Sequence, residues 1–384
     1  MFKLMLDRRL LKNYDWFLLT ITFFIAIIGL VNLYSASYQT DLIGFKKQIV
    51  WVILGTLCMI LLSFLDYKTV ERYTRHIYVV SILLLLVVLV LGKEVSGSKS
   101  WISLGNHISI QPSEFVKIPL ILAIAKFYHD DFEMGSYGLV DLIKPILLVL
   151  IPLALVMLQP DLGTAVTIIL ISGTMMFFMR IRIKSLVLLL ALIIGLSYPA
   201  WHFFLKDYQK ERVLTLVNPY RDPLGTGYNT IQSQIAVGSG KLDGKGFKKG
   251  SQTQLRFIPE QRTDFIFSVI AEEWGFVGGA FTLLLYFTII LWTLDTASRA
   301  KDKFSMLLSF GVASMFFWHT LINVGMVIGI FPVIGVPFLL FSYGGSSTIT
   351  AMLGIGLVLA IRIRKYPVSK EAIEHNYLIK AHLQ

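Results

Sequence analysis

The first apolar run of the chain reads Trp16-Phe-Leu-Leu-Thr-Ile-Thr-Phe-Phe-Ile-Ala-Ile-Ile-Gly-Leu-Val-Asn-Leu-Tyr34 and contains no charged side chain. Runs of about 18–20 apolar residues are long enough to cross the hydrocarbon core of a bilayer as a helix. Basic residues precede this run, and it is too long for the apolar core of a cleaved signal peptide. We therefore expect an uncleaved first transmembrane helix.

The composition of the whole chain agrees with this reading. Hydrophobic residues make up 55% of the 384 residues and charged residues only 15%, whereas a soluble chain carries about 25% charged residues. The single cysteine, Cys58, excludes an intramolecular disulfide. The 7 histidines show no metal-ligand spacing, which argues against a zinc or haem site. The chain is predicted to be an integral membrane protein.

Further apolar runs predict an all-α polytopic membrane protein with ten transmembrane helices, folded as a single domain over residues 1–384. Lys and Arg concentrate in the short loops on one side, so both termini are expected in the cytoplasm, with a cytoplasmic tail from about 363 to 384. An acidic loop near Asp130 and Asp131 is the exception to this bias. The expected helices span about residues 15–36, 47–65, 76–92, 112–128, 141–158, 161–179, 184–203, 265–295, 303–329 and 334–362.

One large polar insert, from about 205 to 264, separates the seventh and eighth expected helices and is predicted to be an extracytoplasmic loop. It is rich in Lys, Arg and Gly, and it ends in Ile258-Pro-Glu-Gln-Arg-Thr-Asp-Phe-Ile-Phe267, which places Asp264 at the mouth of the next helix. Its positive charge suits either a solvated surface near anionic headgroups or an anion-binding site. The residues alone leave both readings open.

Two polar motifs lie where hydrocarbon is expected. In Gln111-Pro-Ser-Glu-Phe-Val-Lys117, Glu114 and Lys117 share one helix face and can pair. An unpaired lysine in the membrane costs about 2.5–3.5 kcal/mol, so a functional cavity explains Lys117 better than a capped helix start does. In Gln159-Pro-Asp-Leu-Gly-Thr-Ala165, Asp161 is predicted to be an N-cap or first-turn acid.

Two further segments break the apolar pattern. The eighth expected helix carries Glu272 beside Glu273, and Glu272 is expected some three turns below the membrane surface, buried with a partner, with a structural pair and a functional role both open. The run from Gly329 to Ser347 holds two prolines near its middle and a Ser-Tyr-Gly-Gly-Ser-Ser sequence. Non-helical backbone at that depth must be buried in protein or line a cavity, and close packing of small residues is the favoured role.

Taken together, these segments resemble the SEDS family (shape, elongation, division and sporulation), and its elongation branch more than its division branch. The resemblance runs in order from the first span to about Arg364. It rests on the motifs above together with Asn218-Pro-Tyr-Arg-Asp-Pro-Leu-Gly-Thr-Gly-Tyr-Asn229, Gln232-Ser-Gln-Ile-Ala236, Gly244-Lys-Gly-Phe247 and Pro337-Phe-Leu-Leu-Phe-Ser-Tyr-Gly-Gly-Ser-Ser347.

The resemblance implies a peptidoglycan glycosyltransferase that polymerises lipid II into glycan strands at the outer face of the cytoplasmic membrane during cell elongation. The implied partners are a class B penicillin-binding protein, which supplies the transpeptidase, and other membrane proteins of the elongation complex; no nucleic acid is expected. Asp264 matches the family's essential acid. The implied substrate-binding residues are Gln111, Ser113, Glu114, Lys117, Arg212, Arg221, Gln232, Arg262 and Ser346.

The expected chemistry fits these residue types. The donor leaves as a lipid diphosphate, a stable anion that needs cations such as Arg212 and no general acid. One carboxylate can serve a single inverting displacement by accepting the proton of the acceptor hydroxyl. An unperturbed Asp, with a pKa of about 3.9, is a poor base at neutral pH, but partial desolvation would raise the pKa. Alternatively, Asp264 holds a divalent cation, Mg²⁺ or Mn²⁺, against the diphosphate.

Two other functions compete with this one. A lipid II flippase or other transporter would also have ten spans, broken helices and intramembrane charges. Against it, the chain shows no inverted repeat, and its polar residues gather toward one membrane face. The third possibility is a non-catalytic scaffold for the transpeptidase, for which Asp264 would be dispensable.

Overall fold

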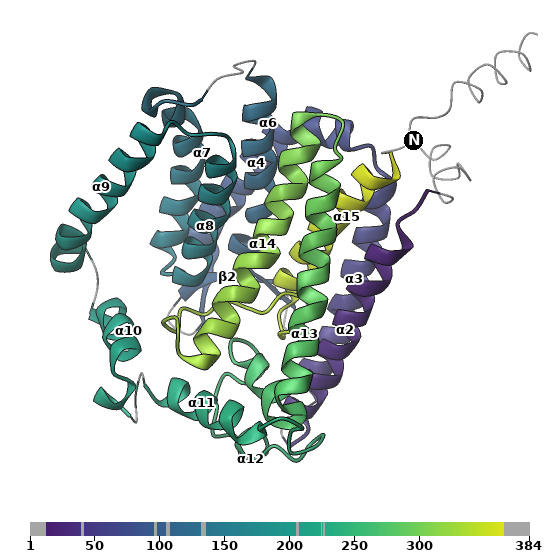
Figure 1. Ribbon diagram of the computed structural model, residues 1–384, viewed down its shortest axis with the longest axis vertical. Helices are drawn as coiled ribbons and strands as arrows, with labels where there is room; N and C mark the ends of the chain where they lie inside the picture. The colour runs from purple at the N-terminus through teal and green to yellow at the C-terminus, as the bar shows by residue number, and fades with distance from the viewer. Residues whose placement is uncertain are drawn as a thin grey trace, which may run out of the picture.

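Long apolar helices run between two distinct ends of the molecule (Figure 1). The computed structural model describes residues 13–39, 42–95, 98–104, 108–131, 136–204, 207–223, 225 and 227–364. Within them, 7 helices are long and apolar enough to cross a membrane: α2 (Trp16–Ser37), α3 (Ile43–Phe64), α4 (Tyr67–Leu91), α7 (Leu139–Leu158), α13 (Ile266–Ser298), α14 (Lys303–Ile328) and α15 (Gly345–Ile363).

Shorter helices complete the bundle. They are α5 (Pro112–Phe115), α6 (Lys117–Asp130), α8 (Leu162–Phe178) and α9 (Ile183–Pro199), the last followed by the π-helical turn η2 (Ala200–Phe204). The observed membrane helices overlap the predicted ranges but several extend beyond them, since α4 begins at Tyr67 rather than 76, α3 at Ile43 rather than 47, and α13 ends at Ser298 rather than 295. The range 334–362 is wrong at its start, however, because residues up to Gly344 are not helical and α15 begins at Gly345.

The two ends of the bundle differ in what they carry. At one end, here called the inner end, Arg362 near the end of α15 pairs with Asp15 before α2 and with Asp295 near the end of α13. Both ends of the described chain therefore lie together (Figure 1). The predicted tail lies outside the described residues beyond Arg364. The polar insert occupies the opposite end, here called the outer end.

The insert is more ordered than the predicted loop. It contains α10 (Asp207–Val217), η3 (Pro219–Arg221), α11 (Tyr228–Gly240) and α12 (Ser251–Gln254), which lie along the outer end (Figure 1). The Ser233 hydroxyl donates to the carbonyl of Val327 at 2.9 Å, which anchors α11 on α14. Its residues 205–206, 224 and 226 lie outside the described part.

A small antiparallel sheet, which was not predicted, also lies toward the outer end. It has the order β1 (Lys93–Val95), β2 (Ser98–Leu104) and β3 (Ile108–Ile110), and it leads from α4 directly into α5. The Ser98 hydroxyl donates to the carbonyl of Gln159 at 2.6 Å, so the sheet is attached to the turn between α7 and α8. This contact helps to fix the position at which α5 begins.

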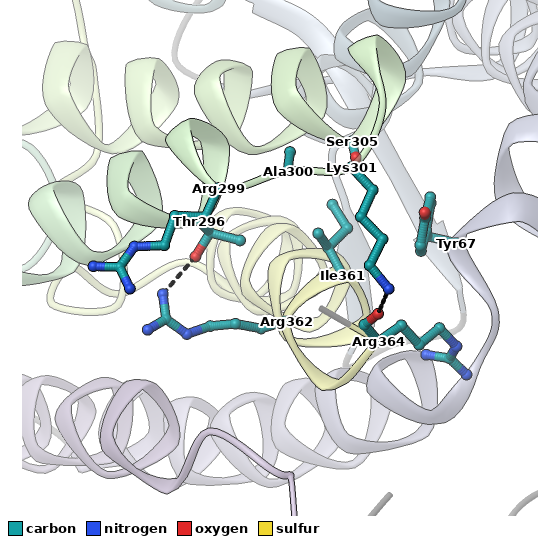
Figure 2. Close-up of a pocket in the computed structure, with 9 residues that line it drawn as sticks. All are labelled: Tyr67, Thr296, Arg299, Ala300, Lys301, Ser305, Ile361, Arg362 and Arg364. Carbon is teal, nitrogen blue, oxygen red and sulfur yellow. Dashed lines mark hydrogen bonds between the residues drawn. The ribbon is translucent and has the colours of Figure 1, made fainter. Parts of the chain in front are cut away.

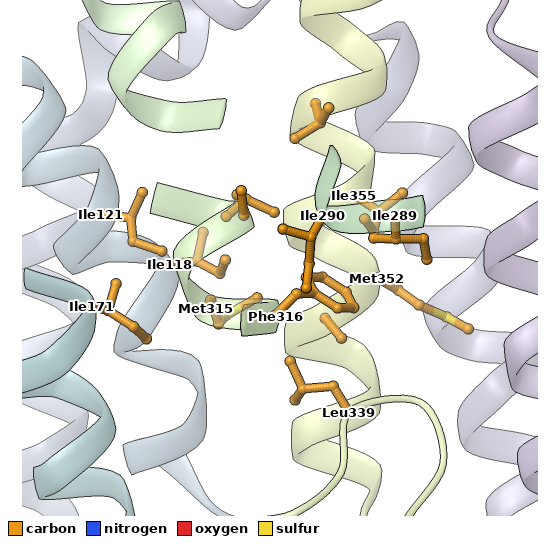
Figure 3. Close-up of a cluster of buried hydrophobic side chains, with 14 of the residues drawn as sticks. Ile118, Ile121, Ile171, Ile289, Ile290, Met315, Phe316, Leu339, Met352 and Ile355 are labelled. Atoms are coloured by element: carbon orange, nitrogen blue, oxygen red, sulfur yellow. The ribbon is translucent and has the colours of Figure 1, made fainter. Parts of the chain in front are cut away.

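The apolar core holds the middle of the bundle together. Side chains from α6, α8, α13, α14 and α15 meet there, and Met315 and Phe316 of α14 lie between Ile118 of α6 and Met352 of α15 (Figure 3). Both α14 and α15 are largely buried, whereas α2, α3, α4 and α7 expose apolar faces to the surroundings. The buried helices α14 and α15 can therefore carry polar side chains that would be energetically unfavourable in contact with lipid.

Helix α13 reverses direction at Gly275, whose φ of 65° and ψ of −161° fall in a region that only glycine adopts readily. A Cβ at Gly279 would lie 3.4 Å from the ring of Phe267, whereas residues twelve apart in a straight helix are about 18 Å apart. Residues 266–274 therefore fold back beside the rest of α13. The freed backbone groups pair with the insert, since Lys245 and Gly246 N–H donate to Glu272 and Glu273 carbonyls at 3.0 and 2.9 Å.

This reversal makes the predicted depth of Glu272 wrong. Asn32 of α2 donates to the Ile266 carbonyl at 3.0 Å, and Ser35, one turn nearer the outer end, donates to Glu273 at 2.6 Å. The half-helix thus runs outward from Asp264, and Glu272 lies at its outer end. The predicted burial with a partner is confirmed, because Glu272 is fully buried and accepts from Lys245 at 2.8 Å.

Replacing Gly275 by Ala is expected to destabilise the protein. The new Cβ would clash with the backbone of Leu242 and Gly244, and the strained φ adds about 1–3 kcal/mol. We expect a lower melting temperature in detergent and a smaller monodisperse fraction. Gly173→Ala in α8, where a Cβ meets nothing within 4 Å, is the control and should melt like wild type. Equal melting of both variants would contradict the strained reversal.

Candidate active site

Asp161 joins the start of α8 to the start of α5. Its Oδ1 accepts from Thr164 N–H at 3.1 Å, so the predicted N-cap is confirmed. Its Oδ2 also accepts from Gln111 Nε2 and Ser113 Oγ, both at 2.8 Å. The N–H of Gln111 in turn donates to Ser346 Oγ in the first turn of α15 at 2.8 Å. Three of the predicted substrate-binding residues therefore lie in one network.

Glu114 and Lys117 form the buried pair that their spacing predicts. Lys117 Nζ lies 2.8 Å from Glu114 Oε1, and the two side chains are 1% and 4% exposed. Pro119 lacks an N–H and therefore leaves the carbonyl of Phe115 unbonded, so the helix breaks at Val116 between α5 and α6. Thr164 Oγ1 donates to the same Glu114 oxygen at 3.4 Å, which connects the pair to the Asp161 network.

His319 of α14 is the second partner of Lys117, and sequence reasoning missed it. Its Nδ1 lies 3.0 Å from the carbonyl of Pro337 and its Nε2 lies 2.9 Å from Lys117 Nζ. A carbonyl only accepts, so Nδ1 carries the proton and Nε2 accepts from the ammonium. The available signal was a pair of polar residues, His319 and Asn323, four apart on an apolar helix.

Asp264 is held by a contact from α14, and the two residues before it are held by the non-helical segment 329–344. Asn323 Nδ2 donates to the Asp264 carbonyl at 2.9 Å, and Ser342 Oγ donates to the Thr263 carbonyl at 2.6 Å. The N–H of Tyr343 donates to the Arg262 carbonyl at 2.8 Å. The segment was predicted mainly to pack; its observed role is also to hold the chain that carries Asp264.

The environment of Asp264 perturbs its carboxyl group. Burial, followed by the negative charges of Glu260 and Asp161, raises its pKa to about 7 against the positive charge of Arg212, which lowers it. Asp264 is thus within electrostatic range of Asp161 in the buried network and of Arg212 on α10. The predicted catalytic acid, buried polar network and insert cation come together at one site.

The remaining predicted residues lie around this site with different surroundings. Arg221 is exposed and pairs with Glu211 at 3.8 Å, and Gln232 is partly buried on α11. Within the described chain, no hydrogen bond joins either side chain to the Asp161 or Asp264 groups. Arg262 lies beside α3, where a Cβ at Gly44 would be 3.8 Å from its Nη1.

A separate pocket at the inner end is rich in cations but is not a candidate for this chemistry (Figure 2). It lies where α13 and α15 end, which favours positive side chains because helix C-termini carry partial negative charge. These cations already have partners: Lys301 donates to the Arg364 carbonyl at 2.6 Å and Arg362 to Thr296 at 2.7 Å.

One group of side chains in the described part of the chain has the ligand types of a metal site. A carboxylate oxygen of Glu71, a carboxylate oxygen of Asp130 and a ring nitrogen of His129 lie within 4.8 Å of one another. Lys126 Nζ lies 3.0 Å from Glu71 and 2.7 Å from Asp130. The ammonium thus already pairs with both carboxylates and offsets one of their two negative charges. The histidine spacing did not predict this cluster, which uses carboxylates from α4 and α6.

The fold and the buried site define a polytopic membrane protein with a polar centre beneath an outer cover. A family model described as "Cell cycle protein" and labelled FtsW, RodA and SpoVE matches residues 15–366. Peptidoglycan glycosyltransferase MrdB of Escherichia coli (strain K12) is 36% identical over 357 residues, covering 92% of this chain and 94% of the relative. Peptidoglycan glycosyltransferase RodA of Treponema pallidum (strain Nichols) is 34% identical over 429 residues, covering 92% and 98%.

Solved structures agree with these relatives. One described as "Structural coordination of polymerization and crosslinking by a peptidoglycan synthase complex" has a TM-score of 0.80 and 35% identity, covering 92% of this chain and 98% of that chain. The crystal structure of RodA from Thermus thermophilus has a TM-score of 0.69 and 32% identity, covering 92% and 98%. The chain belongs to the FtsW/RodA/SpoVE family, which confirms the predicted SEDS membership.

Replacing one member of the Glu114–Lys117 pair should lower the stability of the protein more than replacing both members. Lys117→Met leaves a buried carboxylate without its cation, for which about 3–5 kcal/mol is typical. We expect Lys117→Met to lower the thermal stability strongly and Glu114→Gln/Lys117→Met to recover part of the loss. Melting curves of both single variants and the double variant measure this. Additive losses would show that the two side chains are not coupled.

Proposed function

We propose that this chain is a peptidoglycan glycosyltransferase that polymerises lipid II into glycan strands at the outer face of the cytoplasmic membrane during cell elongation. One observation carries the proposal: Asp264 is within electrostatic range of Asp161 and Arg212, and Thr164 joins Asp161 to the buried Glu114–Lys117 pair in one hydrogen-bond network. Relatives with peptidoglycan glycosyltransferase names share at least a third of their sequence with this chain across nearly its full length.

The proposed topology has ten spans in one domain, with both termini in the cytoplasm and the insert of about 205–264 outside. Asp15, Asp295 and Arg362 meet at the inner end, which supports placing both termini on one side. The basic short loops support the cytoplasm as that side. The protein is accordingly a multi-pass protein of the cytoplasmic (inner) membrane.

A lipid-linked substrate must enter the site sideways from the bilayer. The position and the exposed apolar side chains of α9 are consistent with entry beside this helix. This helix stands apart from the bundle (Figure 1). Among the described residues it makes extensive contacts only with η2, which continues it. Apolar side chains such as Ile183, Val187 and Ile194 are exposed along it. We propose that an undecaprenyl chain approaches along the exposed apolar side chains of α9 while its diphosphate reaches the insert.

In the proposed reaction, the acceptor hydroxyl attacks the anomeric carbon of the donor sugar. A glycosidic bond forms with inversion, the bond to the diphosphate breaks, and undecaprenyl diphosphate leaves with the electron pair. Arg212 and other insert cations stabilise that anion. Asp264 accepts the hydroxyl proton, a role that a pKa of about 7 suits.

The alternative role of Asp264 remains a proposal of equal standing. One carboxylate together with substrate phosphate oxygens is a common way to hold Mg²⁺, and Mn²⁺ would be held by the same oxygens. Polymerisation by protein dialysed against chelator, measured with and without added Mg²⁺ or Mn²⁺, distinguishes the metal ligand from the proton acceptor. The proposed partner is a class B penicillin-binding protein within the elongation complex, in keeping with the synthase complex that this chain resembles.

Asp264→Asn should abolish polymerisation, because the amide neither accepts the proton nor carries charge for a cation. Purified protein, alone and with its penicillin-binding protein, is incubated with lipid II, and glycan chains are resolved on gels. The control is Asp243→Asn, an exposed acid of the same insert, which should polymerise normally. Lipid scrambling in vesicles without polymer from the wild type would favour the flippase and overturn the proposal.

The pH dependence should follow Asp264. Its pKa is raised to about 7, so the active carboxylate predominates above pH 7 and is protonated below. We expect kcat/KM to fall about tenfold per pH unit well below pH 7. Glu260→Gln removes a negative charge that raises this pKa, so its profile should shift to lower pH. An acid limb near pH 4, or one that Glu260→Gln leaves in place, would contradict the assignment.

A further inference from the structure

Two polar residues on α14, His319 and Asn323, lie one helical turn apart and are both 0% exposed. Residues four apart share a helix face, and burial of such groups is costly unless each finds hydrogen-bond partners. The partners of these two side chains come from three separate parts of the chain.

Each residue holds one of two consecutive carbonyls in the non-helical segment. His319 Nδ1 donates to the carbonyl of Pro337 at 3.0 Å, and Asn323 Nδ2 donates to the carbonyl of Val336 at 2.8 Å. Non-helical backbone at membrane depth must find such internal partners. The turn of α14 between the two residues therefore fixes where this segment lies.

Each residue also contacts a different half of the candidate site. His319 Nε2 accepts from Lys117 Nζ at 2.9 Å, whereas Asn323 Nδ2 donates to the backbone carbonyl of Asp264 at 2.9 Å. One rigid helical turn, with a rise of about 6 Å over four residues, thus connects the Glu114–Lys117 pair to the chain that carries Asp264.

We propose that His319 and Asn323 are positioning residues that set the separation between Lys117 and Asp264 during glycosyl transfer. The proposal rests on the proposed function. Neither side chain contacts the reacting atoms in this role; each acts through the group that it holds. Displacements of about 1 Å at a reacting centre can lower rates about a hundredfold, so loss of either contact should affect turnover.

The experiment compares matched substitutions on α14. His319→Phe removes both the donor and the acceptor, His319→Gln retains one of each, and Asn323→Asp keeps the shape but removes the donor when ionised. Thr320→Val is the control, because the Thr320 hydroxyl has no hydrogen-bond partner and the residue lies beside His319 on the same helix. Polymerisation of lipid II is measured against substrate concentration, with rates normalised to folded protein from size-exclusion chromatography.

Loss of a hydrogen bond to a charged group should lower kcat of His319→Phe about tenfold or more, with KM changed by less than about threefold. His319→Gln should recover most of the turnover, and Thr320→Val should match wild type. In a Lys117→Met background, His319→Phe should cause no further loss, because it acts through Lys117. Asn323→Asp should also move the acid limb of the pH profile to higher pH, because it places a negative charge beside Asp264.

Three outcomes would overturn the proposal. The first is an unchanged kcat per folded molecule in His319→Phe, which would show that His319 has a purely structural role. The second is full additivity with Lys117→Met, and the third is an unmoved pH profile in Asn323→Asp. An active wild type with unaffected variants overturns this inference alone, whereas a wild type without polymer overturns the proposed function and this inference with it.

Discussion

Every backbone N–H and C=O inside a bilayer must find a partner within the protein, and besides the break at Val116 this chain interrupts its helices at two places that bear on Asp264. The first interruption, at Gly275, is stabilised by backbone pairing with the insert, where the N–H of Phe276 donates to the Lys241 carbonyl at 2.8 Å. The second, residues 329–344, uses His319 and Asn323 for two of its carbonyls. Because the half-helix that ends at Gly275 begins just after Asp264, and the second segment holds the Thr263 carbonyl, the carboxylate can lie among buried groups without being part of a helix.

The sequence predicted those parts of the site that depend on local spacing. Glu114 and Lys117 are three positions apart, and the pair forms; Asp161 follows a proline before an apolar run, and it caps α8. Asp264 was identified through resemblance, together with its insert cation Arg212. Apolar runs also located the membrane helices, because a span of fixed thickness requires a fixed length of helix.

The features that the sequence did not predict depend on partners far along the chain. His319 and Asn323 are a visible polar pair on an apolar helix, but spacing does not reveal their partners, since those of His319 come from α6 and from Pro337. The reversal at Gly275 was missed for a similar reason. Glycine is frequent in membrane helices, and only pairing with residues 241–246 converts it into a turn. That reversal also inverted the expected depths of Glu272 and Asp264, since a straight helix was assumed.

The proposed chemistry links substrate binding to the strength of the base. Asp264 sits among more negative than positive neighbours, and Arg212 is the cation that lowers its pKa. A bound lipid diphosphate would draw Arg212 toward its phosphate oxygens, because bidentate contacts between Arg and phosphate are strong. The lowering effect on Asp264 would then weaken, so the carboxylate would become a stronger base when the donor is in place. The complex would then gain base strength while a smaller fraction of Asp264 is ionised at neutral pH, a balance that a pKa near the working pH keeps favourable.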